Sequence, residues 1–68
     1  MEISWKSING LDFEFHKLDD ENIPYYKVFT ENYYFEMRQD KKEIWRIQGK
    51  VPVWLQELEE ALGEAIGK

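Results

Sequence analysis

The pattern of apolar and polar side chains changes its period once along this 68-residue chain. Up to about residue 48 the two kinds alternate, which is typical of strands with one buried face; from residue 52 on, apolar side chains recur at helical spacing. The pattern therefore predicts an α+β fold in a single domain over residues 1–68: a five-stranded antiparallel meander with one C-terminal amphipathic helix packed on one face. The predicted strands cover residues 2–7, 11–18, 25–30, 33–39 and 43–48, and the helix covers 52–66.

The connection between the first two strands decides which face of the first strand is buried. A two-residue turn would put the apolar side chains of the two strands on opposite faces of the sheet. A three-residue loop over residues 8–10 instead pairs Trp5 with Phe13 and Ile3 with Phe15. Because a single buried face requires the second arrangement, we predict the three-residue loop.

The second hairpin is predicted to turn at residues 31–32, after a polar loop over residues 19–24. Its inward pairs are Val28 with Phe35, Tyr26 with Met37, and Thr30 with Tyr33. Its outward pairs are Lys27 with Glu36, Phe29 with Tyr34, and Tyr25 with Arg38. Each outward pair is favourable across neighbouring strands.

The last hairpin gives its best match with a loop at residues 40–42, which pairs Met37 with Trp45, Phe35 with Ile47, and Glu36 with Arg46. In that register Glu36 would lie between Lys27 and Arg46 in a ladder of alternating charges. The predicted core then comprises Ile3, Trp5, Phe13, Phe15, Tyr26, Val28, Phe35, Met37, Trp45, Ile47, Trp54, Leu58 and Leu62.

The composition excludes several classes of chemistry. The chain contains no cysteine, so disulfides and thiolate metal ligands are excluded and a reducing, cytoplasmic location is expected. No apolar run approaches the ~18 residues that a membrane span requires. His16 is the only histidine, and a zinc site needs three or four converging ligands. We therefore expect no metal, no cofactor and no enzymatic activity.

The outward face of the last three strands carries the one functional signal in the sequence. Aromatic and basic side chains gather there, whereas the outward face of the first two strands is predicted to be polar, with Glu2, Ser4, Lys6, Asp12, Glu14 and His16. Tyrosine, phenylalanine and arginine are enriched in protein–protein interfaces. The candidate binding surface comprises Tyr25, Lys27, Phe29, Tyr34, Arg38, Ile44 and Arg46, with Glu36 among them.

Two functions are consistent with such a surface, beside the alternative that its rings only hold the strands together. The first is a protein-interaction module, self-associating or bound to another protein. The second is a single-stranded nucleic-acid binder in which rings stack on bases and basic side chains follow phosphates. The net charge of −5 disfavours the second, although residues 25–50 carry six basic and four acidic side chains. The order of antiparallel strands and one C-terminal helix resembles that of the single-stranded-DNA-binding transcriptional coactivator domains, and the resemblance rests on element order alone.

Overall fold

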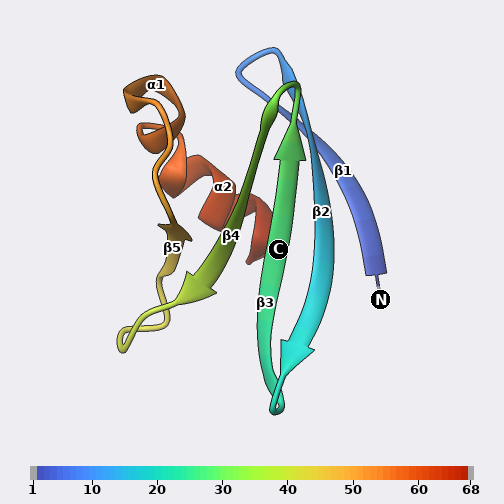
Figure 1. The fold of residues 1–68 in the computed structure, drawn as a ribbon, viewed down its shortest axis with the longest axis vertical. Helices are drawn as coiled ribbons and strands as arrows, with labels where there is room; N and C mark the ends of the chain where they lie inside the picture. Colours follow the sequence, from blue (N-terminus) through green and yellow to red (C-terminus); the bar gives the residue numbers. More distant parts are fainter. Residues whose placement is uncertain (1, 68) are drawn as a thin grey trace.

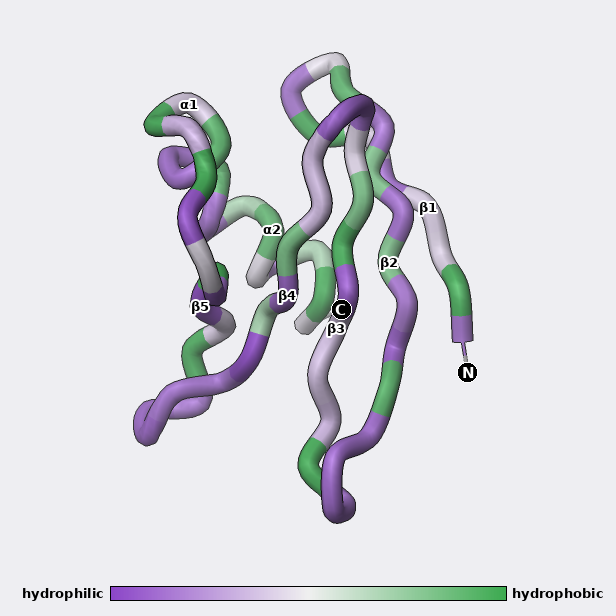
Figure 2. Tube along the Cα trace, in the orientation of Figure 1, coloured by the Kyte–Doolittle hydropathy of each residue, from purple (hydrophilic) through white to green (hydrophobic). Residues whose placement is uncertain are grey.

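Five antiparallel strands form one sheet in chain order, and the helical segment at the C-terminal end packs on one side of it, as predicted (Figure 1). The computed structural model describes residues 2–67. Its strands are β1 (Glu2–Ile8), β2 (Leu11–Asp20), β3 (Ile23–Thr30), β4 (Tyr33–Gln39) and β5 (Trp45–Gln48), and its helices are α1 (Val53–Gln56) and α2 (Glu59–Ile66). Apolar and polar positions alternate along the first part of β2 (Figure 2), and burial alternates with them, which gives the sheet its two faces.

The first two connections are tight two-residue turns. Asn9 and Gly10 have φ angles of 57° and 81°, and Glu21 and Asn22 have φ angles of 52° and 70°. Two successive positive φ angles match the right-handed twist of the flanking strands, which is why such turns favour asparagine and glycine. The predicted loop over residues 19–24 is therefore wrong: β2 and β3 continue into that segment and meet at the turn.

The two-residue turn also overturns the predicted register of the first hairpin. Trp5 pairs with Glu14 and Ile3 with His16, so both apolar side chains of β1 lie on the outward face, the side of the sheet away from the helices. Trp5 is 64% exposed and Ile3 51% exposed. The geometric preference of Asn9-Gly10 prevails because β1 is an edge strand, whose side chains need not join the core.

The second hairpin has the predicted register, and the third differs from it by two residues. Met37 pairs with Ile47 and Gln39 with Trp45, so each side chain keeps its predicted face but has a different partner. Glu36 faces Gln48 instead of an arginine, and the predicted charge ladder does not form. The cause is a longer loop, described below, that begins with Asp40.

The core lies between the inward face of the sheet and the helices. Its buried apolar side chains are Phe13, Phe15, Val28, Phe35, Met37, Ile47, Leu55 and Leu62. Tyr26, Trp45 and Leu58, which were predicted to be core residues, are half-buried and pack against this cluster. Ile3, Trp5 and Trp54 are exposed, so their prediction as core residues is wrong. Leu55 takes the central helical position that was expected of Trp54.

The helical segment is not the single helix over 52–66 that the spacing predicts. It is interrupted at residues 57–58, where the Leu58 amide bonds to the carbonyl of Leu55, three residues back, at 3.0 Å. The break lets Leu55 of α1 and Leu62 of α2 both reach the core. α2 passes behind β3 and β4 in Figure 1, which leaves the outward face of the sheet toward the viewer. None of the helices within residues 2–67 is long and apolar enough to cross a membrane.

Candidate interaction surface

A row of side chains crosses the outward face of four strands. The registers place Trp5 of β1 beside Glu14 of β2, Glu14 beside Phe29 of β3, and Phe29 beside Tyr34 of β4. Directly paired residues of antiparallel strands have their side chains on the same face. Three aromatic rings and one carboxylate thus share one line across the sheet, and Tyr34 at its far end is 52% exposed.

The middle of this row is partly shielded by its own neighbours. The Phe29 ring stacks on Tyr34 with centroids 4.9 Å apart and contacts the His16 ring at 4.8 Å. His16 in turn bonds through Nε2 to the Glu14 carboxylate. Phe29 is half-buried as a result, so cross-strand packing accounts for part of the aromatic content of this face.

The basic side chains of the face are matched by acidic groups. The Arg38 guanidinium lies 4.0 Å from the centre of the Tyr25 ring and 3.5 Å from carboxylate oxygens of both Asp20 and Glu36. The contact of Tyr25 with Arg38 confirms the predicted pair. Lys27 lies opposite Glu36 in the register. The face is therefore aromatic with balanced charge, not basic.

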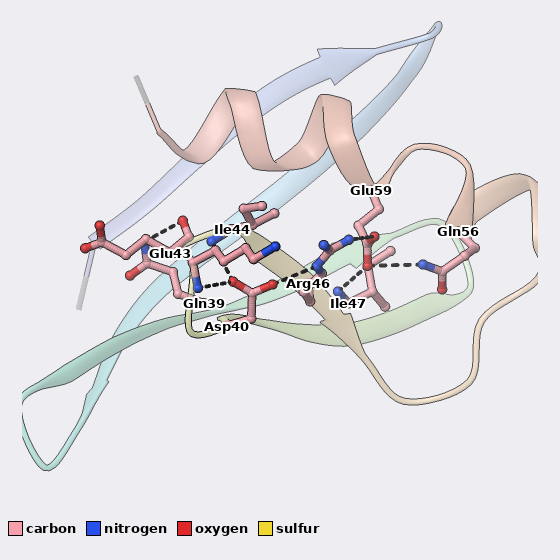
Figure 3. Close-up of polar contacts among 9 residues, drawn as sticks. Gln39, Asp40, Glu43, Ile44, Arg46, Ile47, Gln56 and Glu59 are labelled. Carbon is pink, nitrogen blue, oxygen red and sulfur yellow. Dashed lines mark hydrogen bonds and ion pairs between the residues drawn. The ribbon is translucent and has the colours of Figure 1, made fainter.

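Of the predicted surface, Ile44 belongs to another part of the molecule, and Arg46 is held by carboxylates at the β5 edge. Ile44 lies in the β4–β5 loop and lines a groove of about 350 Å³ between β5 and α2, floored by Trp45 and Gly63. The Arg46 guanidinium donates to Asp40 at 3.1 Å and to Glu59 at 3.3 Å (Figure 3). Arg46 pairs with Arg38 in the register and so shares the outward face with the other five residues, Tyr25, Lys27, Phe29, Tyr34 and Arg38.

Asp40 organises the loop that carries Ile44. Its Oδ1 accepts hydrogen bonds from the Lys42 and Ile44 amides at 2.8 and 3.0 Å, and its Oδ2 accepts one from Arg46. The Ile44 amide, with Arg46 and the Lys42 amide, lowers the pKa of the Asp40 carboxyl below its usual value. Hydrogen bonds to the two carboxylates raise the pKa of Arg46.

Glu59 connects α2 to the outer edge of β5. One of its oxygens, Oε2, accepts hydrogen bonds from the Ile47 amide at 2.9 Å and from Gln56 at 3.1 Å, while Oε1 accepts one from Arg46 (Figure 3). Burial alone would raise the pKa of Glu59, but the bonds from Ile47, Gln56 and Arg46 together hold that pKa below its ordinary value. This cluster is a structural tether between strand and helix.

Ile3 and Trp5 are the surface residues that the sequence analysis missed. They extend the apolar face to β1, where the outward side was expected to be polar; Glu2, Ser4 and Lys6 lie on the inward side instead. The available signal was Asn9-Gly10, a strong marker of a two-residue hairpin turn. Ile23, at the β2–β3 turn, adds a further exposed apolar side chain, 62% exposed.

A cluster of metal-binding side chains is not found in the part of the chain that the structure describes. No three histidine, aspartate or glutamate side chains of residues 2–67 come together as metal ligands. His16, the sole histidine, is paired with Glu14 and Phe29. No protein-family model matches the chain, and no curated protein or solved structure matches it significantly. The geometry of the outward face is therefore the basis for a functional proposal.

Proposed function

We propose that this protein is a small non-enzymatic interaction module that associates with a second copy of itself through the outward face of its sheet. The observation that supports this most strongly is the exposure of Trp5, Ile3 and Tyr34 on a sheet face opposite to both helices. Monomeric proteins seldom expose contiguous apolar patches larger than a few hundred Å² unless the patch binds something. The cysteine-free sequence supports a reducing, cytoplasmic compartment for this module.

The chemistry of the face suits a protein partner. Tryptophan, tyrosine and arginine carry much of the binding energy in protein–protein interfaces, and charged groups stay at the rim. Here Trp5 and Tyr34 lie at the two ends of the aromatic row, and Arg38 lies to one side with its own carboxylate partners.

Nucleic-acid binding has less support. Arg38 and Arg46, two of the side chains expected to follow phosphates, are both held by carboxylates of this chain. Phosphate affinity depends on Lys and Arg side chains that are free to neutralise phosphates and so release the counterions of the nucleic acid. The whole chain, in addition, has a net charge of −5. We therefore treat oligonucleotide binding as an outcome to be tested, not as a second proposal.

The test is sedimentation or light scattering of the purified protein from low to high micromolar concentration, with and without a mixed single-stranded oligonucleotide. Trp5→Lys and Tyr34→Lys probe the two ends of the face, and Val53→Lys is the control, because Val53 is 76% exposed on α1 and the charge change is the same. Loss of either aromatic contact should weaken the dimer by roughly 30-fold or more.

A protein that stays monomeric at high micromolar concentration would contradict the proposal. So would a dimer that tolerates both face variants as well as it tolerates the control. Complex formation with the oligonucleotide, steeply weakened by salt, would favour the nucleic-acid alternative instead.

A further inference from the structure

We infer that two copies of this chain join edge to edge through β1, antiparallel and centred on Ser4, to form one continuous sheet of two protomers. This inference rests on the proposed self-association, and it adds to the contact of the outward faces a second contact, along the β1 edge, with its own register. It leaves the rings of β3 and β4 on a widened outward face.

The free backbone groups follow from the turn. In a two-residue hairpin the pair that closes the turn is hydrogen-bonded, and bonded and non-bonded pairs alternate from there. Ile8 and Leu11 close the first hairpin, so Lys6, Ser4 and Glu2 also bond to β2. The N–H and C=O groups of Ile3, Trp5 and Ser7 then point away from β2, and no other strand within residues 2–67 pairs with β1.

The side chains of β1 match an antiparallel copy of the same strand in one register. With Ser4 opposite Ser4 of the second copy, Glu2 lies opposite Lys6, and Ile3 lies opposite Trp5, each twice by symmetry. Opposite charges and apolar pairs in these positions stabilise neighbouring strands. In this register the N–H and C=O groups on the open edge of Ile3 also lie opposite those of Trp5 in the second copy. The two residues can therefore form the backbone hydrogen bonds that each lacks in the single protomer.

The neighbouring registers fit less well. A shift that keeps the backbone groups matched moves the strand by two residues along its partner. One such shift places Trp5 opposite itself and Lys6 opposite Ser4; the other places Ile3 opposite itself and Glu2 opposite Ser4. Neither pairs Glu2 with Lys6. The charge pattern of β1 therefore favours the register centred on Ser4.

The inward side of β1 is open enough for a second copy to approach. A groove of about 220 Å³ separates the strand from the end of α2, and another of about 390 Å³ lies beside Glu2, Ser4 and Lys17. β1 forms one margin of the molecule in Figure 1, with both helices away from its outer edge. Ser4 itself is exposed and small, which suits the close approach of a non-hydrogen-bonded pair.

A single cysteine at Ser4 tests the register directly. Non-hydrogen-bonded partners have Cα atoms about 4.5 Å apart, within the range that a disulfide spans. The chain has no cysteine of its own, so any disulfide in Ser4→Cys must join two chains. Ser7→Cys is the control: it lies on the same exposed strand, but the two copies of residue 7 would be about 20 Å apart, six residues of strand.

Under mild oxidation, Ser4→Cys should form a covalent dimer at least about tenfold faster than Ser7→Cys, as seen by non-reducing electrophoresis and mass spectrometry. A matched set of charge variants provides the second readout. Lys6→Glu places like charges opposite each other twice and should raise the dimer Kd about tenfold, and Glu2→Lys with Lys6→Glu should restore it to within about threefold. Lys6 forms no ion pair within residues 2–67, so the single change leaves the protomer unaltered.

The outcomes separate this inference from the proposed function. Equal cross-linking of the two cysteine variants, or a dimer indifferent to Lys6→Glu, overturns the edge contact. In that case a dimer weakened by Tyr34→Lys still supports self-association by the face. A chain that remains monomeric throughout overturns both.

Discussion

The two edges of the sheet are protected very differently. At the β5 edge, the Ile47 amide donates to the Glu59 carboxylate of α2. α2 also packs closely against this strand, because a Cβ on Gly63 would lie 3.4 Å from the Trp45 Cβ. At β1 every residue from Glu2 to Ser7 is exposed, and the outer backbone groups have no partner within residues 2–67. Unprotected edges pair readily with other strands, and proteins usually block them with charges, bulges or covering segments.

The contrast between the two edges supports the proposed edge contact through β1. The same chain closes one edge with a carboxylate and a helix, and it leaves the other unbulged, with the side chains of Ile3 and Trp5 exposed on it. The only charges on β1, Glu2 and Lys6, are opposite in sign and symmetric about Ser4. Such an arrangement does not repel a second copy, as a row of lysines would.

The largest loss of stability is expected when the protection of the β5 edge is removed. Glu59→Ala leaves the Ile47 amide without its acceptor and Arg46 without one of its two carboxylates. We expect a loss of about 2 kcal/mol in the free energy of unfolding, measured by chemical denaturation. The control is Glu60→Ala on the same turn of α2, whose carboxylate is exposed and forms no hydrogen bond within the described residues; it should cost less than about 0.5 kcal/mol. Equal losses for the two variants would show that the tether does not hold β5.

The tether should also make stability depend on pH in an acidic window. Hydrogen bonds lower the pKa of Glu59 and of Asp40 in the folded state, so their contribution is fully present above the unfolded pKa of about 4 and is lost as pH falls through the lower folded values. Glu59→Gln should therefore be less stable than the wild type by about 1 kcal/mol at neutral pH, and the difference should shrink toward zero in strong acid. Thermal unfolding of both proteins across this range would measure it. A difference that stays constant with pH would contradict the assignment.

A smaller effect is expected where the helix meets the closed edge. Gly63 lies in the interior of α2, and a methyl group there would come into van der Waals contact with Trp45. Gly63→Ala should therefore raise the free energy of unfolding by about 0.5–1 kcal/mol, because alanine favours the helix and no strain opposes it. Denaturant titration measures the change. A loss of stability instead would show that the helix approaches β5 too closely for any side chain.

The sequence predicts the α+β fold, the strand order and the middle hairpin correctly, because a strict alternation and a short turn fix that register together. The predicted register is wrong where the preferred geometry of a turn does not allow all apolar side chains to lie on one buried face. At β1 the Asn9-Gly10 turn prevails, and Ile3 and Trp5 move to the outward face. At β5 the error is a two-residue shift, which alternation alone cannot detect. The hydrogen bonds that lengthen this loop run from the Lys42 and Ile44 backbone amides to the Asp40 carboxylate, and a hydrophobic pattern does not show such bonds.

The same limits explain the candidate surface. Tyr25, Lys27, Phe29, Tyr34 and Arg38 are placed together by the hairpin whose register was predicted correctly. Ile44 was assigned to this face but lies in the longer loop before β5, whereas Arg46 keeps its predicted face because the register error is an even number of residues. The Arg46 guanidinium binds Asp40 and Glu59, which lie six and thirteen positions away from Arg46 in the sequence. The ion pair between Arg46 and Glu59 depends on where α2 packs against β5. The pattern of apolar and polar residues does not specify that position.

The smallest expected signal compares the two edges amide by amide. The Ile47 amide bonds within the chain, so its hydrogen exchange should be slow and independent of protein concentration. The Trp5 amide points away from β2 at the open edge of the sheet. Pairing with a second β1 would supply the acceptor that this amide lacks. Its hydrogen exchange should therefore slow by about tenfold as the protein concentration rises through the dimer Kd. The Lys6 amide, which faces Phe13 across β2, is the internal reference and should change little. Parallel slowing of Trp5 and Lys6 would mean that association stabilises the whole hairpin without pairing its edge, whereas slowing of Trp5 alone identifies β1 as the strand through which two sheets become one.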